Sequence, residues 1–354
     1  MPGREGLKAL LAGSVSLVLA LLLGEFVVRL ASPENPLGRD SRQPMTGTES
    51  LPKLKGVLSL ARPNVRGIFN GVVHQTNSAG FRGREYSLEK PANTFRVVVI
   101  GDSVTMGSGV EESKVYASVL ESELNRRRAD RNYEVLNLGI SGLDLKTSVQ
   151  ARLEKIGLKF DPDLLVYGFT LNDLEGPAYI KVARGHGGKR VPRYTPGESR
   201  LLELIRVRWR YLRELIYPPA DSYVYELDKN YFDNPPAWNV FETALESFAA
   251  IARDRDVCGV VLIHTALHSL GSLHPYTRHY QKVRNTAEAN GLFVIDPFNA
   301  FNGYRAKTLW VHPFDSHPNA EGHAILAREL EKGLDALPDT CWEMPPETPI
   351  ERSL

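Results

Sequence analysis

Short apolar runs alternate with longer amphipathic stretches over most of the chain. The apolar runs have the length and composition of buried strands and lie at 95–100, 133–138, 164–168, 259–264 and 292–296. Stretches with helical spacing lie at 115–128, 145–157, 240–253, 276–290 and 320–337. Strands that alternate with helices form a parallel sheet with right-handed crossovers. The pattern therefore predicts an α/β domain with a five-stranded parallel sheet.

The amino-terminal end has a different pattern. Residues 9–24 carry no charge, and Glu25 and Arg29 lie one helical turn apart, where they can pair. An apolar run of about 22 residues can span a bilayer. We predict a membrane anchor over 1–32, with an exported domain behind it. A cleaved signal peptide is the alternative, with Ala31 in the nearest cleavage signal.

Changes in composition predict the domain boundaries. Residues 33–55 are polar and rich in Pro, Gly and Ser, which suits a linker. Residues 56–92 contain short extended pieces and turn signals, and we expect a small β appendage there. The α/β domain then spans 93–340, with an insertion at 175–238 and a tail at 341–354. The insertion follows the carboxyl end of a strand, so it is either a lid beside a site or a surface decoration.

Charge and cysteine content narrow the classes of partner. A formal net charge of +1 gives no electrostatic argument for nucleic acid. Neither Cys258 nor Cys341 has a cysteine or histidine at metal-ligand spacing, so we expect no metal site. Both cysteines are expected at the amino-terminal edge of the sheet. They could form a disulfide in an oxidising compartment, or they could be two unrelated thiols.

Three residues have the chemistry of a nucleophilic hydrolase. Ser103 follows the first strand, at the carboxyl end where open α/β sheets place their chemistry. Asp315 and His317 stand just before the last helix. A serine hydroxyl needs a base such as His317, and the base needs an orienting acid such as Asp315. The order Ser, Asp, His along the chain is one that serine hydrolases use, so the sequence indicates an ester hydrolase.

Two more strand ends offer donors for a developing oxyanion. Gly139 ends the second strand, where its N–H can face a site without obstruction by a side chain. Asn172 follows the third strand, and its amide can donate a hydrogen bond. His264 and His268 follow the fourth strand and are weaker candidates to line a pocket.

In order, Ser103, Gly139, Asn172 and His317 match the four blocks of the SGNH (GDSL-like) esterase and lipase superfamily. The resemblance covers about residues 93–338. It implies a three-layer α/β/α, flavodoxin-like fold and a Ser-His-Asp mechanism without metal or cofactor. It also implies an oxyanion hole made of the Ser103 N–H, the Gly139 N–H and the Asn172 side chain.

Two positions depart from the family pattern. Many members place the acid three residues before the histidine, where this chain has Phe314, whereas Asp315 lies two before it. Thr170 replaces the glycine two places before the asparagine of the third block, which narrows the expected pocket floor.

The leading hypothesis is a membrane-anchored, exported serine esterase in the periplasm or at the cell surface. It would remove an acyl group, such as acetyl, from a small molecule, a carbohydrate or an envelope polymer. An O-acyltransferase that uses the same triad is one alternative, because water and a sugar hydroxyl compete for one acyl-enzyme. A catalytically idle glycan-binding protein is the other.

Overall fold

The computed structural model describes residues 16–27, 60–174, 199, 201–202, 205, 209, 223–268, 270–271, 274–312 and 315–343. The chain divides into two compact units, which are described separately. One comprises residues 1–43 and 186–225, and the other comprises residues 44–185 and 226–354.

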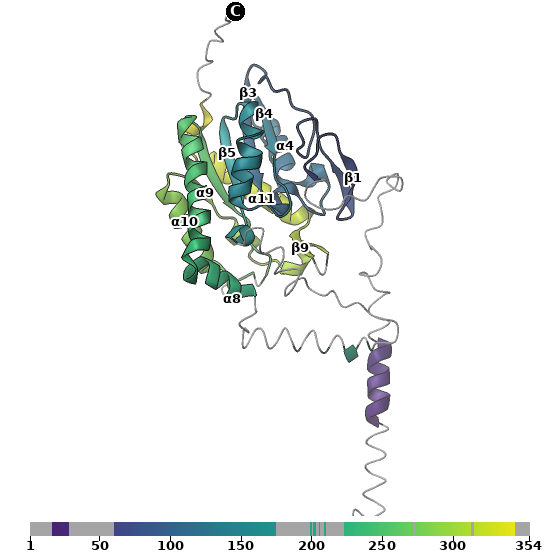
Figure 1. The fold of residues 1–354 in the computed structure, drawn as a ribbon. Coiled ribbons are helices and arrows are strands. Elements are labelled where there is room, and N and C mark those ends of the chain that lie inside the picture. Colours follow the sequence, from purple (N-terminus) through teal and green to yellow (C-terminus); the bar gives the residue numbers. More distant parts are fainter. Residues whose placement is uncertain are drawn as a thin grey trace, which may run out of the picture. The chain divides into compact units, whose positions relative to one another are not determined.

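The larger unit contains the predicted five-stranded parallel sheet (Figure 1). Its strands are β3 (Thr94–Gly101), β4 (Asn132–Asn137), β5 (Leu164–Phe169), β6 (Cys258–Ile263) and β7 (Phe293–Ile295). They lie in the order β4-β3-β5-β6-β7. The chain goes from β3 to β4 on one side and then crosses to β5 on the other side of β3, so the strand order reverses there. Open α/β sheets bind their ligands at the carboxyl ends of the strands at such a switch point. The carboxyl ends of β3 and β5 are therefore the expected place for a site.

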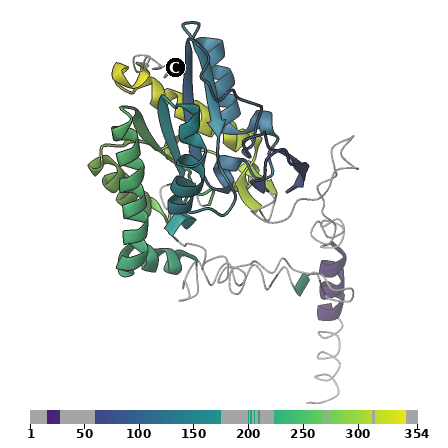
Figure 2. The same ribbon diagram turned by 45° about the horizontal axis from the view of Figure 1, so that its top comes forward.

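Helices cover both faces of this sheet (Figure 2). On one face, α4 (Tyr116–Arg127) and α11 (Ala320–Asp335) pack on each other and on alternate residues of β3, including Val97 and Val99. On the other face, α9 (Pro235–Asp254) and α10 (Thr277–Ala289) pack against β5 through aromatic rings. Successive apolar side chains of the strands point to opposite faces of the sheet, so each face has its own hydrophobic core.

Most of the predicted helices are found, with two differences. The stretch at 145–157 is divided into α5 (Leu145–Thr147), the π-helical η2 (Ser148–Leu153) and the 3₁₀ turn η3 (Gly157–Phe160). The helix expected from residue 240 begins at Pro235, because proline is favoured in the first helical turn. The other short helices are α3 (Ser103–Met106), η1 (Glu112–Lys114), η4 (Leu171–Leu174), α8 (Tyr223–Asp228), η6 (Lys229–Asp233), η7 (Phe298–Phe301), η8 (Ala306–Leu309) and η9 (Asp339–Trp342).

Two small antiparallel sheets accompany the main one. The first, β1 (Arg66–Phe69) with β2 (Val72–Gln75), forms the predicted β appendage. Its turn is Asn70-Gly71, with φ values of 49° and 84°, which is the left-handed geometry that two-residue hairpins favour. The second, β8 (Trp310–His312) with β9 (Asp315–Pro318), was not predicted.

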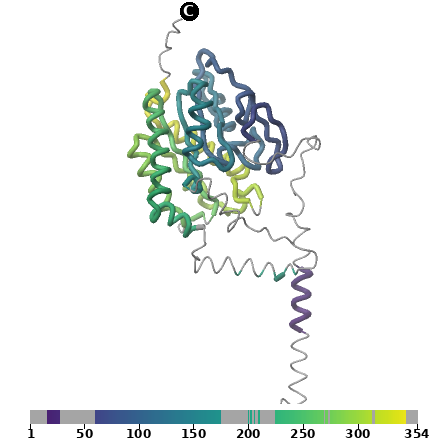
Figure 3. Tube along the Cα trace, viewed as in Figure 1, coloured from purple at the N-terminus to yellow at the C-terminus, as the bar shows by residue number. Residues whose placement is uncertain are grey.

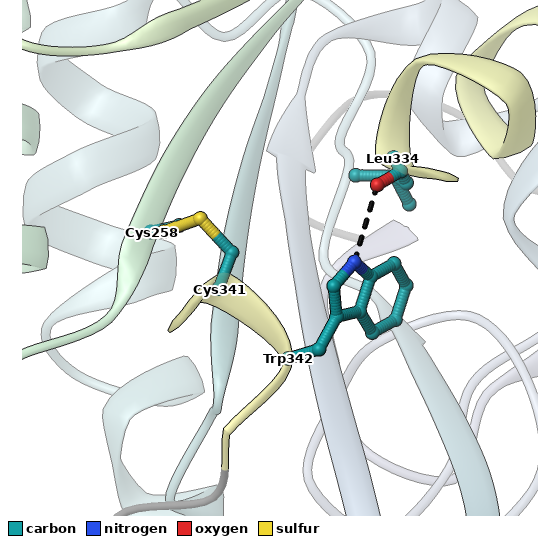
Figure 4. Close-up of a disulfide and its surroundings, with 4 residues drawn as sticks. All are labelled: Cys258, Leu334, Cys341 and Trp342. Atoms are coloured by element: carbon teal, nitrogen blue, oxygen red, sulfur yellow. Dashed lines mark hydrogen bonds between the residues drawn. A yellow bond between two sulfur atoms is a disulfide. The ribbon is translucent and has the colours of Figure 1, made fainter. Parts of the chain in front are cut away.

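The amino-terminal edge of the sheet is closed by the carboxyl-terminal end of the domain. A disulfide joins Cys258 at the start of β6 to Cys341 in η9, with 5.3 Å between the Cα atoms (Figure 4). Next to it, the Trp342 indole donates to the carbonyl of Leu334 at 3.2 Å. The expected position of both cysteines at this edge is confirmed, and so is the bond.

Arg96, the one charged residue in the first predicted strand, is completely buried at the same edge. Its Nε lies 2.6 Å from the Glu134 carboxylate, and its terminal nitrogens donate to the carbonyls of Ser87, Leu88 and Phe160. Buried charges are tolerated when they are paired and hydrogen-bonded in this way. The polar break in the apolar run is therefore part of the core.

In the smaller unit, residues 16–27 are helical and expose most of their apolar side chains. The Glu25 carboxylate accepts hydrogen bonds from the Ser199 hydroxyl at 2.7 Å and from the Leu201 N–H at 2.8 Å. The rest of the predicted anchor lies outside the described residues. Within the described part of the chain, no helix has both the length and the apolar character needed to cross a membrane.

Candidate active site

The first candidate residue, Ser103, stands at the sharp turn that follows β3. Asp102 caps the short helix α3, because its Oδ1 accepts the Val104 N–H at 2.9 Å. Gly107 ends the helix in a left-handed conformation, with φ of 77°. Ser103 is thus the first residue of a four-residue helix at the carboxyl end of a central strand, the position predicted from the sequence.

The hairpin β8–β9 brings the acid and the imidazole to this serine. His317 Nε2 lies 2.8 Å from Ser103 Oγ, and His317 Nδ1 lies 2.5 Å from Asp315 Oδ1. The Ser103 hydroxyl also lies 3.2 Å from Asp102 Oδ2, so the imidazole is its shorter contact. The three predicted side chains therefore form one continuous series from hydroxyl to imidazole to carboxylate.

The unusual spacing of Asp315 and His317 follows from the strand that carries them. Both residues belong to β9, and side chains two apart on a strand point to the same face. A separation of two residues is therefore the one that lets a carboxylate reach the imidazole from within a strand. Asp315 Oδ1 also accepts the His317 backbone N–H at 3.2 Å, which fixes the pair further. Phe314, at the usual position of the acid, lies outside the described residues.

Three glycines at the strand ends make room for α3. A Cβ on Gly101 or Gly168 would lie 2.2 or 2.4 Å from the hydroxyl of Thr105, and one on Gly139 would lie 2.7 Å from its Cβ. Such distances are far shorter than carbon contacts allow, so larger residues at these positions would push the helix away. The role of Gly139 is thus at least partly one of close packing.

The N–H of Gly139 already has an acceptor in this structure. It donates to the Asn137 side-chain oxygen at 3.0 Å, and Asn137 Nδ2 donates in turn to the carbonyl of Thr105 at 2.7 Å. An oxyanion at this place would have to share the Gly139 donor with Asn137 or take it over. Asn137 was missed in the sequence, although a buried polar residue at the end of an apolar strand was a usable signal.

Asn172 is placed by a well-held turn after β5. Its neighbour Asp173 is buried and accepts hydrogen bonds from the Thr170 N–H at 3.0 Å and the Tyr167 hydroxyl at 2.5 Å. Burial and the nearby Asp102 carboxylate raise the pKa of Asp173 well above its usual value. The Asn172 side chain itself makes no hydrogen bond to another residue that the structure describes, which leaves its amide available to a ligand.

The described end of the insertion supports the same turn. The Tyr231 hydroxyl, in η6, donates to the carbonyl of Leu171 at 3.0 Å, and the Tyr231 side chain is buried. This part of the insertion is therefore integrated into the domain. Most of the rest of the insertion at 175–238, where a lid was considered, lies outside the described residues.

The two weaker histidine candidates, His264 and His268, both pack against aromatic rings. His264 is 3% exposed, and its ring lies directly under Gly168 and edge-on to Tyr116. Burial lowers the pKa of His264 to about 4, so the ring is neutral at ordinary pH. His323 is buried and stacks on the Tyr116 ring, and burial lowers its pKa to about 3. His268 packs edge-on against Trp310.

The described residues contain no group of three or more His, Cys, Asp or Glu side chains arranged to hold a metal ion. The polar groups at the strand ends are instead a hydroxyl, an imidazole, a carboxylate and amide donors. This set suits nucleophilic attack on a carbonyl carbon and stabilisation of the resulting oxyanion.

Similar solved structures include several esterases. LAE5, an α/β hydrolase from the metagenome of Lake Arreo, Spain, is 17% identical over 71% of this chain and 99% of that chain, with a TM-score of 0.43. Axe2, an acetylxylan esterase from Geobacillus stearothermophilus, is 17% identical over 68% of this chain and 94% of that chain, with a TM-score of 0.42. At this degree of likeness we draw no conclusion from either. No curated protein sequence matches the chain.

The family of the chain follows from a match over most of the larger unit. Residues 99–325, well over half of the chain, match the GDSL-like Lipase/Acylhydrolase family. The matched region begins in β3 and ends in α11, so it includes every residue of the candidate site. The protein belongs to the GDSL-like lipase and acylhydrolase family and is a serine hydrolase that acts on ester bonds.

Proposed function

We propose that this esterase uses Ser103 as nucleophile, His317 as general base and Asp315 as the acid that orients the base. The observation that carries the proposal is the series of contacts at 2.8 Å and 2.5 Å that joins the three side chains. In such a series, the carboxylate holds the proton on Nδ1, so that Nε2 is free to accept the proton of the serine hydroxyl.

The reaction then proceeds in two halves. Ser103 Oγ attacks the ester carbonyl while His317 Nε2 takes its proton, and the same proton passes to the departing alcohol. Water repeats the sequence on the acyl-enzyme and releases the acid. The Ser103 N–H, the Gly139 N–H and the Asn172 side chain are the proposed donors to the oxyanion, and of the three the Gly139 N–H has a competing acceptor, the Asn137 side-chain oxygen.

We further propose that the substrate is an acylated carbohydrate or envelope polymer, with acetyl as one possible acyl group. The side chains of His317 and Asp315 are 33% and 24% exposed, so the reacting groups lie at the surface, within reach of a large substrate. The disulfide supports an oxidising, extracytoplasmic location. A membrane anchor over 1–32 would hold the enzyme in the periplasm or at the cell surface.

The test uses the purified full-length protein with p-nitrophenyl acetate and with longer acyl chains. We expect turnover with the wild type and with Ser118→Ala, a surface serine of α4, and none above background with Ser103→Ala. Turnover by folded Ser103→Ala would contradict the mechanism.

A second arm adds a sugar acceptor and follows the acyl group by mass spectrometry. Transfer to the sugar in preference to water would identify an O-acyltransferase. Binding of an acylated glycan with no turnover of any ester would identify the idle binding protein.

The location is tested on protein taken from its native compartment. Alkylation before and after reduction should reveal Cys258 and Cys341 only after reduction. Two free thiols in that protein would contradict the exported location.

A further inference from the structure

The appendage, predicted at 56–92 and described from residue 60, lies outside the part of the chain that matches the family. It nevertheless adjoins the edge of the sheet next to the candidate site (Figure 3). Arg82 pairs through its backbone with Thr76 of the appendage and with Asn137 at the carboxyl end of β4. Asn137 is the residue whose side chain holds the Gly139 N–H. The appendage thus contacts the strand end that carries a proposed oxyanion donor.

The side chain of Arg82 reaches the nucleophile turn. Its Nη1 donates to the carbonyls of Met106 and Gly107 at 2.7 and 2.8 Å, and its Nη2 donates to the carbonyl of Val110 at 2.6 Å. These carbonyls belong to the end of α3 and the loop behind it. Carbonyl groups at the end of a helix have no partner within the helix, so a cationic side chain is a suitable donor to them.

This contact is made by a buried cation. Arg82 is 3% exposed, and among the described residues it forms no ion pair with a carboxylate. Burial lowers the pKa of its guanidinium to about 10, which leaves it charged at neutral pH. A buried charge costs free energy unless it is well hydrogen-bonded. Here the compensation comes from the carbonyls of the nucleophile turn, which accept from both terminal nitrogens, whereas Nε is buried without a partner among the described residues.

The turn needs such support. A helix of four residues is far below the length that is stable by itself, so its direction is set by tertiary contacts. The direction of α3 fixes where Ser103 Oγ and the Ser103 N–H point. Asn70, in the turn of the appendage hairpin, adds a hydrogen bond from its Nδ2 to Ser108 Oγ at 2.6 Å.

The loop held by Arg82 also adjoins the hairpin that carries the base. A Cβ on Gly109 would lie 3.2 Å from Val311 of β8, so the loop and the hairpin are in close contact there. At the end of β4, Arg152 of η2 donates to the carbonyls of Leu138 and Gly80, at 3.2 and 2.9 Å. The appendage is thus connected to the nucleophile turn and to the end of β4, and the loop that it holds contacts the hairpin of the base.

We propose that Arg82 is a positioning residue for ester hydrolysis and that the appendage is a working part of the active site. Arg82 touches no substrate atom in this proposal. It acts by holding α3 at the angle that keeps Ser103 aligned with His317. The inference rests on the proposed role of Ser103.

The experiment compares Arg82→Met, Arg82→Lys and Arg84→Met in the full-length protein. Arg84 is the matched control, because it joins the appendage to Glu121 of α4 and does not touch the nucleophile turn. A misplacement of about 1 Å at a reacting group can cost on the order of 100-fold in rate. We therefore expect Arg82→Met to lower kcat about 10- to 100-fold with little change in KM.

Two further readouts separate positioning from simple loss of structure. The rate at which an uncharged fluorophosphonate labels Ser103 should fall with kcat in Arg82→Met. Arg82→Lys keeps a cation that can reach part of the carbonyl set, so it should recover much of the loss. Arg84→Met should stay close to the wild type in both measurements.

Three results would overturn the proposal: an unchanged kcat in folded Arg82→Met, a change in KM alone, or an equal loss in Arg84→Met. If Arg82→Met does not fold, Asn70→Ala tests the same turn and should lower kcat without changing KM. Failure of this inference is distinguishable from failure of the proposed function, because the wild type would then still depend on Ser103.

Discussion

The two edges of the main sheet differ in how completely their buried polar groups are hydrogen-bonded. At the amino-terminal edge, Arg96 is paired with Glu134, and Asp163 accepts the Arg96 N–H at 2.7 Å. At the carboxyl-terminal edge, the ring nitrogens of His264 and the hydroxyl of Thr170 are buried without a hydrogen-bond partner in the described part of the chain. At the amino-terminal edge these buried groups are paired, which favours stability. At the carboxyl-terminal edge, some buried polar groups without a partner lie beside the reactive side chains. Substitutions at the two edges should therefore have separable effects.

The largest effect should come from Asp315→Asn at the carboxyl-terminal edge. The amide keeps the shape of the carboxylate but favours the wrong imidazole tautomer, so we expect kcat to fall by about 10⁴-fold. The melting temperature should change little, because Asp315 is half-buried and lies on a small hairpin. Steady-state kinetics and thermal unfolding on the same preparation check both statements. A near-normal kcat would mean that another group orients His317.

Glu134→Ala at the amino-terminal edge should give the reverse result. It leaves the buried Arg96 guanidinium without its carboxylate, and such losses cost about 3–5 kcal/mol of unfolding free energy. The kcat of the folded fraction should be unchanged. Glu111→Ala is the control, because it breaks an exposed ion pair with Lys114 that should contribute less than about 1 kcal/mol. Denaturant unfolding measures both. Equal destabilisation by the two variants would remove the contrast between the edges.

Asn172→Ala returns to the reactive edge with a smaller effect. Loss of one oxyanion donor typically lowers kcat about 10²- to 10³-fold, and KM should hardly change. Asn125→Ala in α4, remote from the proposed donors, is a control for loss of a side-chain amide. A rise in KM with unchanged kcat would show that Asn172 contacts the substrate in its ground state.

The smallest effect concerns pH. The pKa of His264 is about 4 in the fold and 6.5 when unperturbed, so between these values the unfolded chain binds more protons. The free energy of unfolding should therefore fall as the pH drops from 6.5 towards 4, by at most about 1.4 kcal/mol per pH unit for this residue. His264→Leu should flatten that dependence relative to wild type. Asp173 acts in the opposite direction but is common to both proteins, so the difference isolates His264.

Much of the fold was predictable because the buried strands have continuous apolar sequences. The strand expected at 164–168 is observed as Leu164–Phe169, and the one at 95–100 as Thr94–Gly101. The hairpin β8–β9 was not predictable in this way. Its strands are short and half-buried. Asp315 and His317 are polar residues with a proposed catalytic role, so they do not contribute to an apolar run. The residues of this hairpin therefore show no alternation of apolar and polar positions.

The candidate site shows the same division. Ser103, Asp315 and His317 could be found because a serine, an aspartate and a histidine in this order are typical of serine hydrolases. Arg82 could not, because an arginine in a turn-rich segment is normally read as a surface residue. Its role depends on which carbonyls lie within reach after folding. The same holds for Asn137, because its side-chain oxygen can accept the Gly139 N–H only where the fold brings the two together.

The disulfide between Cys258 and Cys341 has a consequence for proteolysis. The covalent loop that it closes contains α10, the hairpin β8–β9 and α11, and hence His317, whereas Ser103 lies before it. A protease that cuts the backbone once between Cys258 and His317 would leave two pieces that the disulfide still joins. The nucleophile would be on one piece and the base on the other. Such a nicked enzyme would migrate as a single species until a reducing agent is added, and only then would its two catalytic halves separate.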